Sequence, residues 1–207
     1  MRTIACLLLL ILAPAAAGGA PSTPNTRLIV PGERLGPVDA EASLDDLRVA
    51  LGPGNAVAEK VLDQDGSRVP GAVLYPSDPR RRIEIAWSDT AGRRRPAWAR
   101  VRGRATAWRT SAGIRVGTTL LELEKLNGRA FTVWGFGGTR PGRVRSWNDG
   151  ALDDELKKDA WVSLRLPSRA PAREVAALSH GSVLPSGDPS LRRLNPRVGE
   201  IVVRFER

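Results

Sequence analysis

The sequence predicts an α+β fold: two units, each a short helix followed by antiparallel strands, form one domain whose mostly antiparallel sheet carries the helices on one face. Three observations lead to this prediction. A pattern typical of a helix start occurs twice, and stretches that alternate apolar and polar residues follow each occurrence. The helical stretches are also too short for the crossover connections of a parallel sheet.

The first residues have the features of a secretory signal. Arg2 precedes an apolar run from Leu7 to Leu12, and three consecutive alanines end at Ala17, as at a signal-peptidase site. The run is shorter than the ~20 apolar residues that span a bilayer, so no membrane segment is expected in the mature chain. We expect cleavage of residues 1–17 near Ala17, a flexible leader over residues 18–34, and a periplasmic or secreted protein.

The remaining residues, 35–207, are enough to bury the core of a single domain. We expect its two units to cover about residues 35–110 and 111–207. The sole cysteine, Cys6, lies in the predicted signal, so neither a disulfide nor a thiolate metal site is expected in the mature protein.

In the first unit, Ser43 precedes a leucine-bearing stretch and Asp46 follows it by three residues, which is typical of a capped helix start. Strands are then predicted at residues 56–63, 72–75 and 82–88, with a hairpin turn at residues 65–66.

The second helix is predicted at the same pattern, because Thr119 and Glu122 stand 76 positions after Ser43 and Asp46. This constant shift indicates an internal duplication. Strands are predicted at residues 131–136 and 143–147 around a glycine-rich turn, and a last strand is predicted around Ile201, Val203 and Phe205.

Positive charge is concentrated in the middle of the chain. The net charge is +10, and residues 91–147 alone carry 13 basic and 2 acidic side chains. Arg100, Arg102 and Arg104 alternate with small or apolar residues, so on a strand they would point the same way about 6.8 Å apart. Trp98 and Trp108 lie nearby, and these five residues are the candidate binding face.

Clustered guanidinium groups pair with phosphates and carboxylates. For an exported protein this predicts an anionic envelope component or an acidic protein as the partner, and not nucleic acid. The simpler interpretation, a solvated strand face that serves solubility, stays open. Among the tryptophans, Trp87, Trp134 and Trp161 are predicted in the core, whereas Trp98, Trp108 and Trp147 are predicted as partly exposed platforms beside arginines.

Residues for catalysis are scarce. His180 is the only histidine, and the chain has neither a Gly-x-Ser-x-Gly elbow nor a phosphate-binding loop that ends in Lys-Ser or Lys-Thr. We expect no catalytic, metal or cofactor site, and a short helix that starts with acids at residues 153–155. The leading expectation is an exported, non-catalytic binding or scaffold protein. The alternative is a hydrolase or transferase that acts on envelope polymers through paired carboxylates.

The block Gly117-Thr118-Thr119-Leu120, Glu122-Leu123-Glu124-Lys125-Leu126-Asn127-Gly128 and Phe131 resembles a block found in uncharacterised exported bacterial proteins. The repeated order of glycine, hydroxyl, leucine, acid, leucine and glycine before strands also resembles the SmpA/OmlA and β-lactamase-inhibitory-protein-like superfamily. That resemblance implies helices packed on an antiparallel sheet and a role in protein binding or envelope assembly. The lipidation cysteine of the lipoprotein members is missing here, and the chain has no recognisable inhibitor loop.

Overall fold

The computed structural model describes residues 27–156, 159–179 and 181–205. The predicted signal, the first part of the predicted leader and His180 therefore lie outside the described residues. Within them the fold is α+β and mostly antiparallel, as predicted.

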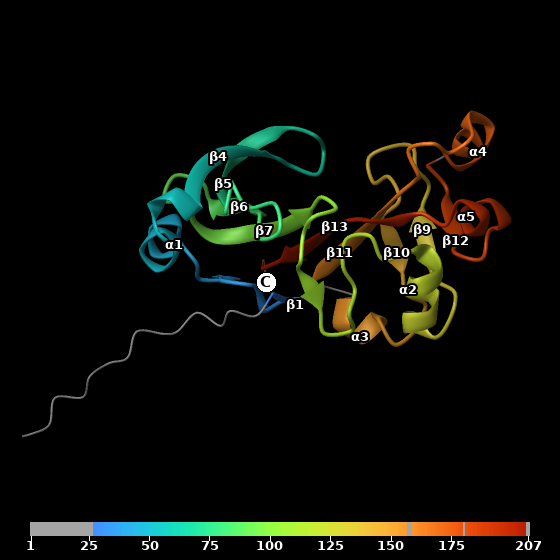
Figure 1. Ribbon diagram of the computed structural model, residues 1–207, viewed down its shortest axis with the longest axis horizontal. Coiled ribbons are helices and arrows are strands. Elements are labelled where there is room, and N and C mark those ends of the chain that lie inside the picture. The colour runs from blue at the N-terminus through green and yellow to red at the C-terminus, as the bar shows by residue number, and fades with distance from the viewer. Residues whose placement is uncertain (1–26, 157–158, 180, 206–207) are drawn as a thin grey trace, which may run out of the picture.

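The largest element is a six-stranded antiparallel sheet with the order β11-β13-β7-β6-β5-β4 (Figure 1). Its strands are β4 (Ala56–Leu62), β5 (Arg68–Leu74), β6 (Ile83–Asp89), β7 (Arg94–Arg102), β11 (Ala160–Arg165) and β13 (Arg197–Arg204). The strands β4 to β7 form a meander that begins after the first helix. β4 and β6 lie close to the predicted positions, β5 begins four residues before the predicted strand, and β7 was not among the predicted strands. β13 extends from the end of the molecule that carries α4 and α5 to its middle, where it lies beside β7.

Two smaller sheets complete the fold. The first has the order β3-β2-β1-β8 and consists of β1 (Leu28–Val30), β2 (Arg34–Leu35), β3 (Val38–Asp39) and β8 (Arg109–Thr110). The second has the order β10-β9-β12 and consists of β9 (Thr132–Trp134), β10 (Val144–Ser146) and β12 (Val183–Pro185). The pairing of β1 with β8 is parallel.

The helices are short. They are α1 (Leu44–Leu51), the 3₁₀ turn η1 (Pro53–Asn55), α2 (Leu120–Asn127), α3 (Asp153–Leu156), α4 (Ala172–Leu178) and α5 (Pro189–Leu194). In α2 the predicted reciprocal cap is present: Thr119 accepts from the Glu122 N–H, and the Glu122 carboxylate accepts from the Thr119 N–H. In α1 Ser43 accepts from the Asp46 N–H, while the Asp46 carboxylate accepts from the Ser43 hydroxyl.

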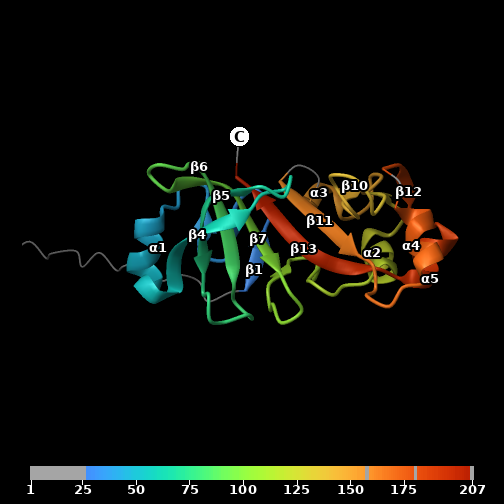
Figure 2. The same cartoon turned by 90° about the horizontal axis from the view of Figure 1, so that it is seen from above.

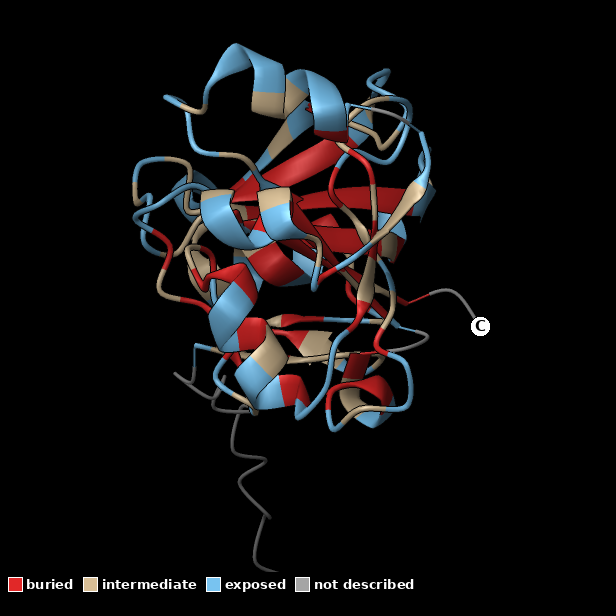
Figure 3. Cartoon of the chain, turned by 90° about the vertical axis from the view of Figure 1, so that its right-hand side faces the viewer, coloured by how far each residue is buried: buried red, intermediate tan, exposed pale blue. Residues whose placement is uncertain are grey.

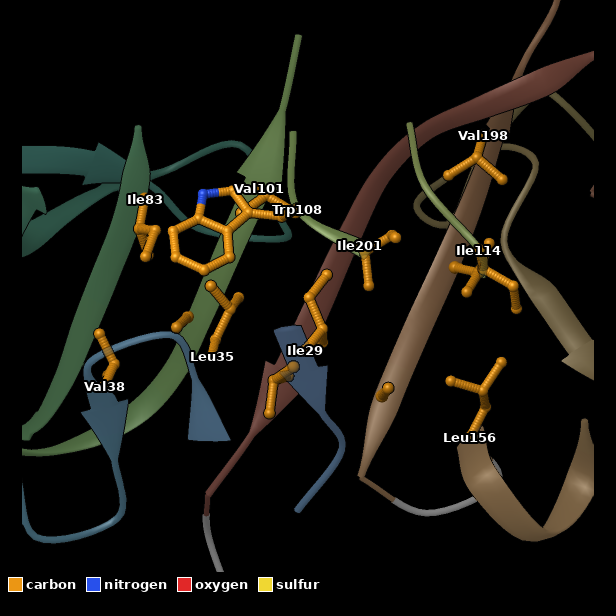
Figure 4. Packing of buried hydrophobic residues seen from close by; sticks show 14 of the residues in the cluster. Ile29, Leu35, Val38, Ile83, Val101, Trp108, Ile114, Leu156, Val198 and Ile201 are labelled. Atoms are coloured by element: carbon orange, nitrogen blue, oxygen red, sulfur yellow. The ribbon is translucent and has the colours of Figure 1, made fainter. Parts of the chain in front are cut away.

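The main core lies between one face of the large sheet and the elements that cover it. Alternate residues of β6, β7, β11 and β13 point into this core, where they meet the leucines of α1, α2 and α3 (Figure 4). Figure 3 shows the buried strands enclosed by helices whose outer sides are exposed. Ile29 and Leu35 of the small first sheet are fully buried in the same core.

The burial of β1 corrects the expected length of the leader. Residues 28–30 are a Leu-Ile-Val triplet that pairs with both β2 and β8, so the folded domain begins before residue 34. Burial of the apolar triplet stabilises the fold. This stabilisation exceeds the preference for a loop that the neighbouring prolines and glycines indicate.

Both helix starts attach to the sheet in the same way. Ser43 forms an antiparallel bridge with Arg94 at the start of β7, and Thr119 forms one with Arg197 at the start of β13. Two backbone hydrogen bonds flank each bridge in equivalent positions. Each unit thus ties the cap of its helix to the first residue of its last long strand.

The same shift relates the strands beside them. Glu84 and Asp89 of β6 pair with Arg100 and Arg94 of β7. In β11, residues 160 and 165, each 76 positions later, pair with residues 203 and 197 of β13, each 103 positions later. The extra 27 positions fall between β11 and β13, where the second unit contains α4, β12 and α5. The two last strands, β7 and β13, pair with each other and so join the strands of the two units in one sheet.

Candidate anion-binding site

Three residues of the predicted basic face, Trp98, Arg100 and Arg102, lie on the side of the large sheet away from the main core, but this side is not open to solvent. Trp98 and Arg100 share that side of β7, as their alternation predicts. The β4–β5 hairpin covers both of them: the Trp98 indole N–H donates to Asp63 at 3.1 Å, and Arg100 Nη2 donates to the Leu62 carbonyl at 2.7 Å. Arg100 is only 5 % exposed, so the expectation of an exposed Arg100 is wrong.

Glu84 of the neighbouring strand forms ion pairs with Arg100 and Arg102 of β7, and Glu200 of β13 lies 3.9 Å from Arg100 Nη1. Glu84 Oε2 accepts from Arg100 Nη2 at 2.7 Å, and Glu84 Oε1 accepts from Arg102 Nη2 at 2.8 Å. Burial alone would raise the pKa of Glu84, but the hydrogen bonds and positive charges of Arg100 and Arg102 outweigh it and hold that pKa below its ordinary value. Arg100 and Arg102 therefore form an internal ion-pair cluster, and Arg102 remains only partly exposed.

Neither tryptophan of the predicted face is a platform. Trp98 packs in a small apolar cluster with Val73 and Val202 under the hairpin. Trp108 lies in the main core, where its indole N–H donates to the Arg81 carbonyl at 3.0 Å. A buried indole contributes a large apolar area and needs one acceptor, and each of these two has one.

The remaining tryptophans also divide differently from the expectation. Trp87 is buried as predicted, but Trp147 is buried as well. Trp134 and Trp161 are only partly buried, and arginines cover their rings: Arg143 lies 4.4 Å from the Trp161 ring centroid. Burial and then the neighbouring Arg140 charge lower the pKa of Arg143.

Arg104 is the one member of the predicted face that is fully exposed. It lies just beyond β7, at a groove of about 560 Å³ formed with the end of β11 and the start of β13. We call this the arginine groove, because its lining includes Arg104, Arg165, Arg169 and Arg197. Val116, Leu166 and Val198 supply its apolar part.

The charges of the arginine groove are not balanced. No acidic residue belongs to the described lining, and none of the four arginines lies within ion-pair distance of a carboxylate in the parts of the chain that the structure describes. A charge of opposite sign nearby is Glu122 of α2, whose pKa is lowered by its bonds to Thr119 and then by the charges of Arg197 and Arg115. Arg197 Nη1 also donates to the Gly117 carbonyl at 3.1 Å. Arg165 and Arg197 are direct cross-strand partners in the pairing of β11 with β13. Like charges placed opposite each other destabilise a sheet, so this arrangement calls for an anion.

The first unit provides an internal comparison. The positions equivalent to Arg165 and Arg197 are Asp89 and Arg94, which pair across β6 and β7. There the Asp89 carboxylate accepts from Arg94 Nη2 at 3.0 Å, and its pKa is lowered by the Gly92 N–H and by Arg94. The second unit thus has an arginine where the first has the neutralising carboxylate.

Other chemistry is not indicated in the described residues. Residues 27–156, 159–179 and 181–205 contain no group of three or more His, Cys, Asp and Glu side chains that could hold a metal ion. Over the same residues, no helix has the length and apolar character needed to cross a membrane. Comparisons of the chain with protein-family models, with curated proteins and with solved structures find no match.

Proposed function

We propose that this protein is an exported, non-catalytic binding or scaffold protein that holds an anionic group of an envelope component in the arginine groove. The observation that carries the proposal is the cross-strand pair of Arg165 and Arg197, in which neither guanidinium lies within ion-pair distance of a described carboxylate. Guanidinium groups that are not committed to an internal ion pair are available to bind phosphate or carboxylate oxygens through two parallel hydrogen bonds.

The proposal differs from the sequence-based expectation in the residues that carry the function. Arg100 and Arg102 are committed to ion pairs with Glu84, and Trp98 and Trp108 are buried, so of the predicted face only Arg104 is retained. Arg165, Arg169 and Arg197 join it from three other places in the chain. The expected partner stays anionic, because the groove presents only positive charge.

The test is retention of the mature protein on envelope fractions at increasing salt. The double variant Arg165→Gln/Arg197→Gln should elute at lower salt than the wild type, because exposed ionic contacts weaken as salt screens them. Arg129→Gln/Arg173→Gln is the matched control, since both arginines are exposed and lie outside the arginine groove. Equal elution of the two double variants would overturn the proposal.

A further inference from the structure

A second groove borders the arginine groove and has the same unbalanced charge. It has a volume of about 840 Å³, and its lining contains Arg27, Arg80, Arg109 and Arg115 and no acidic residue. None of these arginines is ion-paired to a carboxylate within the described residues. Arg109 and Arg115 are bridge partners, so this groove also places two arginines opposite each other.

The two grooves adjoin along two segments of the chain. In the first segment, residues 103–104 line the arginine groove and residues 105–107 line the second groove. In the second segment, residues 116–117 line the arginine groove and Arg115 lines the second. One charged surface therefore continues from one groove to the other.

The topology places both grooves at the same end of the large sheet. β7 and β11 end there, and β6 and β13 begin there, because neighbouring strands are antiparallel. In Figure 2 the loops that follow β5, β7 and β11 lie along one edge of the molecule. We call this the arginine edge; it comprises the two grooves and their eight arginines.

The surroundings of the arginine edge favour a polymer over a folded acidic protein. Protein interfaces usually centre on exposed apolar or aromatic side chains. The large hydrophobic side chains that are exposed among the described residues are Val49, Val57, Leu121 and Leu126, and none of them lines either groove. The apolar residues that line the arginine groove, Val116, Leu166 and Val198, are buried or half-buried and form no exposed apolar centre. A chain of repeated anionic groups needs no such centre, because its contacts are mainly ionic.

Building on the proposed function, we propose that the arginine edge binds an extended polyanion, a polymer with repeated phosphate groups, which occupies both grooves at once. One anionic group would lie between Arg165 and Arg197 and accept hydrogen bonds from both, and a group farther along the polymer would do the same between Arg109 and Arg115. Occupying two linked sites with one ligand raises the affinity without any new kind of contact.

The experiment measures binding of the mature protein to tripolyphosphate and to long-chain polyphosphate at low salt. We expect the long chain to bind on the order of 100-fold more tightly per molecule, and its affinity to fall more steeply with salt. Arg109→Gln/Arg115→Gln should weaken long-chain binding on the order of tenfold or more and leave tripolyphosphate binding at the arginine groove in place.

The outcomes separate the two proposals. If both probes bind equally and Arg165→Gln/Arg197→Gln weakens both, the polymer inference is wrong and the proposed function stands. If neither probe binds and an acidic protein is instead retained through Arg165 and Arg197, the polymer inference is again wrong. If the Arg165→Gln/Arg197→Gln variant binds and elutes like the wild type and the Arg129→Gln/Arg173→Gln control, both proposals are wrong.

Discussion

Arg100 and Glu84 are joined by two hydrogen bonds to one carboxylate oxygen, from Nε at 3.1 Å and from Nη2 at 2.7 Å, and both side chains are buried. Glu84→Gln removes the charge that compensates Arg100, so we expect the free energy of unfolding to fall by ~3–5 kcal/mol in a urea titration. Glu33→Gln is the control, because Glu33 is 70 % exposed in its ion pair with Arg34 and its loss should change little. Equal effects of the two substitutions would contradict this prediction.

The same carboxylate should make stability depend on pH. Burial alone would raise the pKa of Glu84. Its bonds to Arg100 and Arg102 have the larger effect, so the pKa lies below the ordinary 4.5. The unfolded chain then takes up the proton first as pH falls, so the stabilisation is complete above pH 4.5 and is lost below it. Urea titrations of wild type and Glu84→Gln should therefore converge as pH falls below 4.5. A difference that stays constant across this range would show that the charge of Glu84 does not stabilise the fold.

Trp108 should act on stability and not on binding. It is 4 % exposed in the main core, so Trp108→Ala should lower the free energy of unfolding by ~3–5 kcal/mol through the cavity it leaves. Leu121→Ala, at a residue 38 % exposed on α2, should cost far less. Trp108→Phe keeps most of the apolar volume and should retain binding to envelope fractions at wild-type salt. Loss of that retention in a folded Trp108→Phe variant would contradict this prediction and show that Trp108 takes part in binding.

Arg165→Asp should recreate in the second unit the ion pair that Asp89 and Arg94 form in the first. We expect a gain in the free energy of unfolding of ~0.2–1 kcal/mol at low salt, because an opposite-charge pair replaces a like-charge pair. Envelope retention should fall at the same time. Asp89→Arg is the reciprocal variant and should lose stability, since it places two arginines opposite each other across β6 and β7.

The salt dependence of stability tests whether Arg165→Asp and Asp89→Arg act through charge. Both stability changes should shrink in urea titrations at ~1 M salt, where exposed charges are screened within a few ångströms. If Arg165→Asp destabilised the protein at low salt, the like-charge pair would not be the strained feature described for the arginine groove.

Local patterns in the sequence were sufficient for the fold class, for α1 and α2 and for several strands, but they did not locate β1, β8, α4 or α5. Thr119 and Glu122 fixed the start of α2, and alternation located β4, β6 and β13 close to their observed bounds. Burial was not equally predictable. Alternation placed Trp98 and Arg100 on one side of β7, but it gave no information on the hairpin that folds over that side from another part of the chain.

The site depended on contacts distant in sequence. Arg165 and Arg197 are 32 positions apart and become neighbours only through the pairing of β11 with β13. One signal could have found them: extending the 76-position shift beyond the helices aligns Arg165 with Asp89, where the charge is reversed. The arginines of β7 were predicted to be exposed because their ion-pair partner, Glu84, lies on the preceding strand and is not close to them in sequence.

The pairing of β7 with β13 also determines what happens when the chain is cut into its two units. Each strand supplies the hydrogen-bonding neighbour that the other half lacks, so a fragment ending near residue 110 would leave residues 98–102 of β7 as an unpaired sheet edge. Such an edge can be satisfied by an identical strand from a second fragment, because the junction already has local twofold character. Separated halves of this protein should consequently self-associate instead of remaining monomeric, and mixing them should restore the intact pairing.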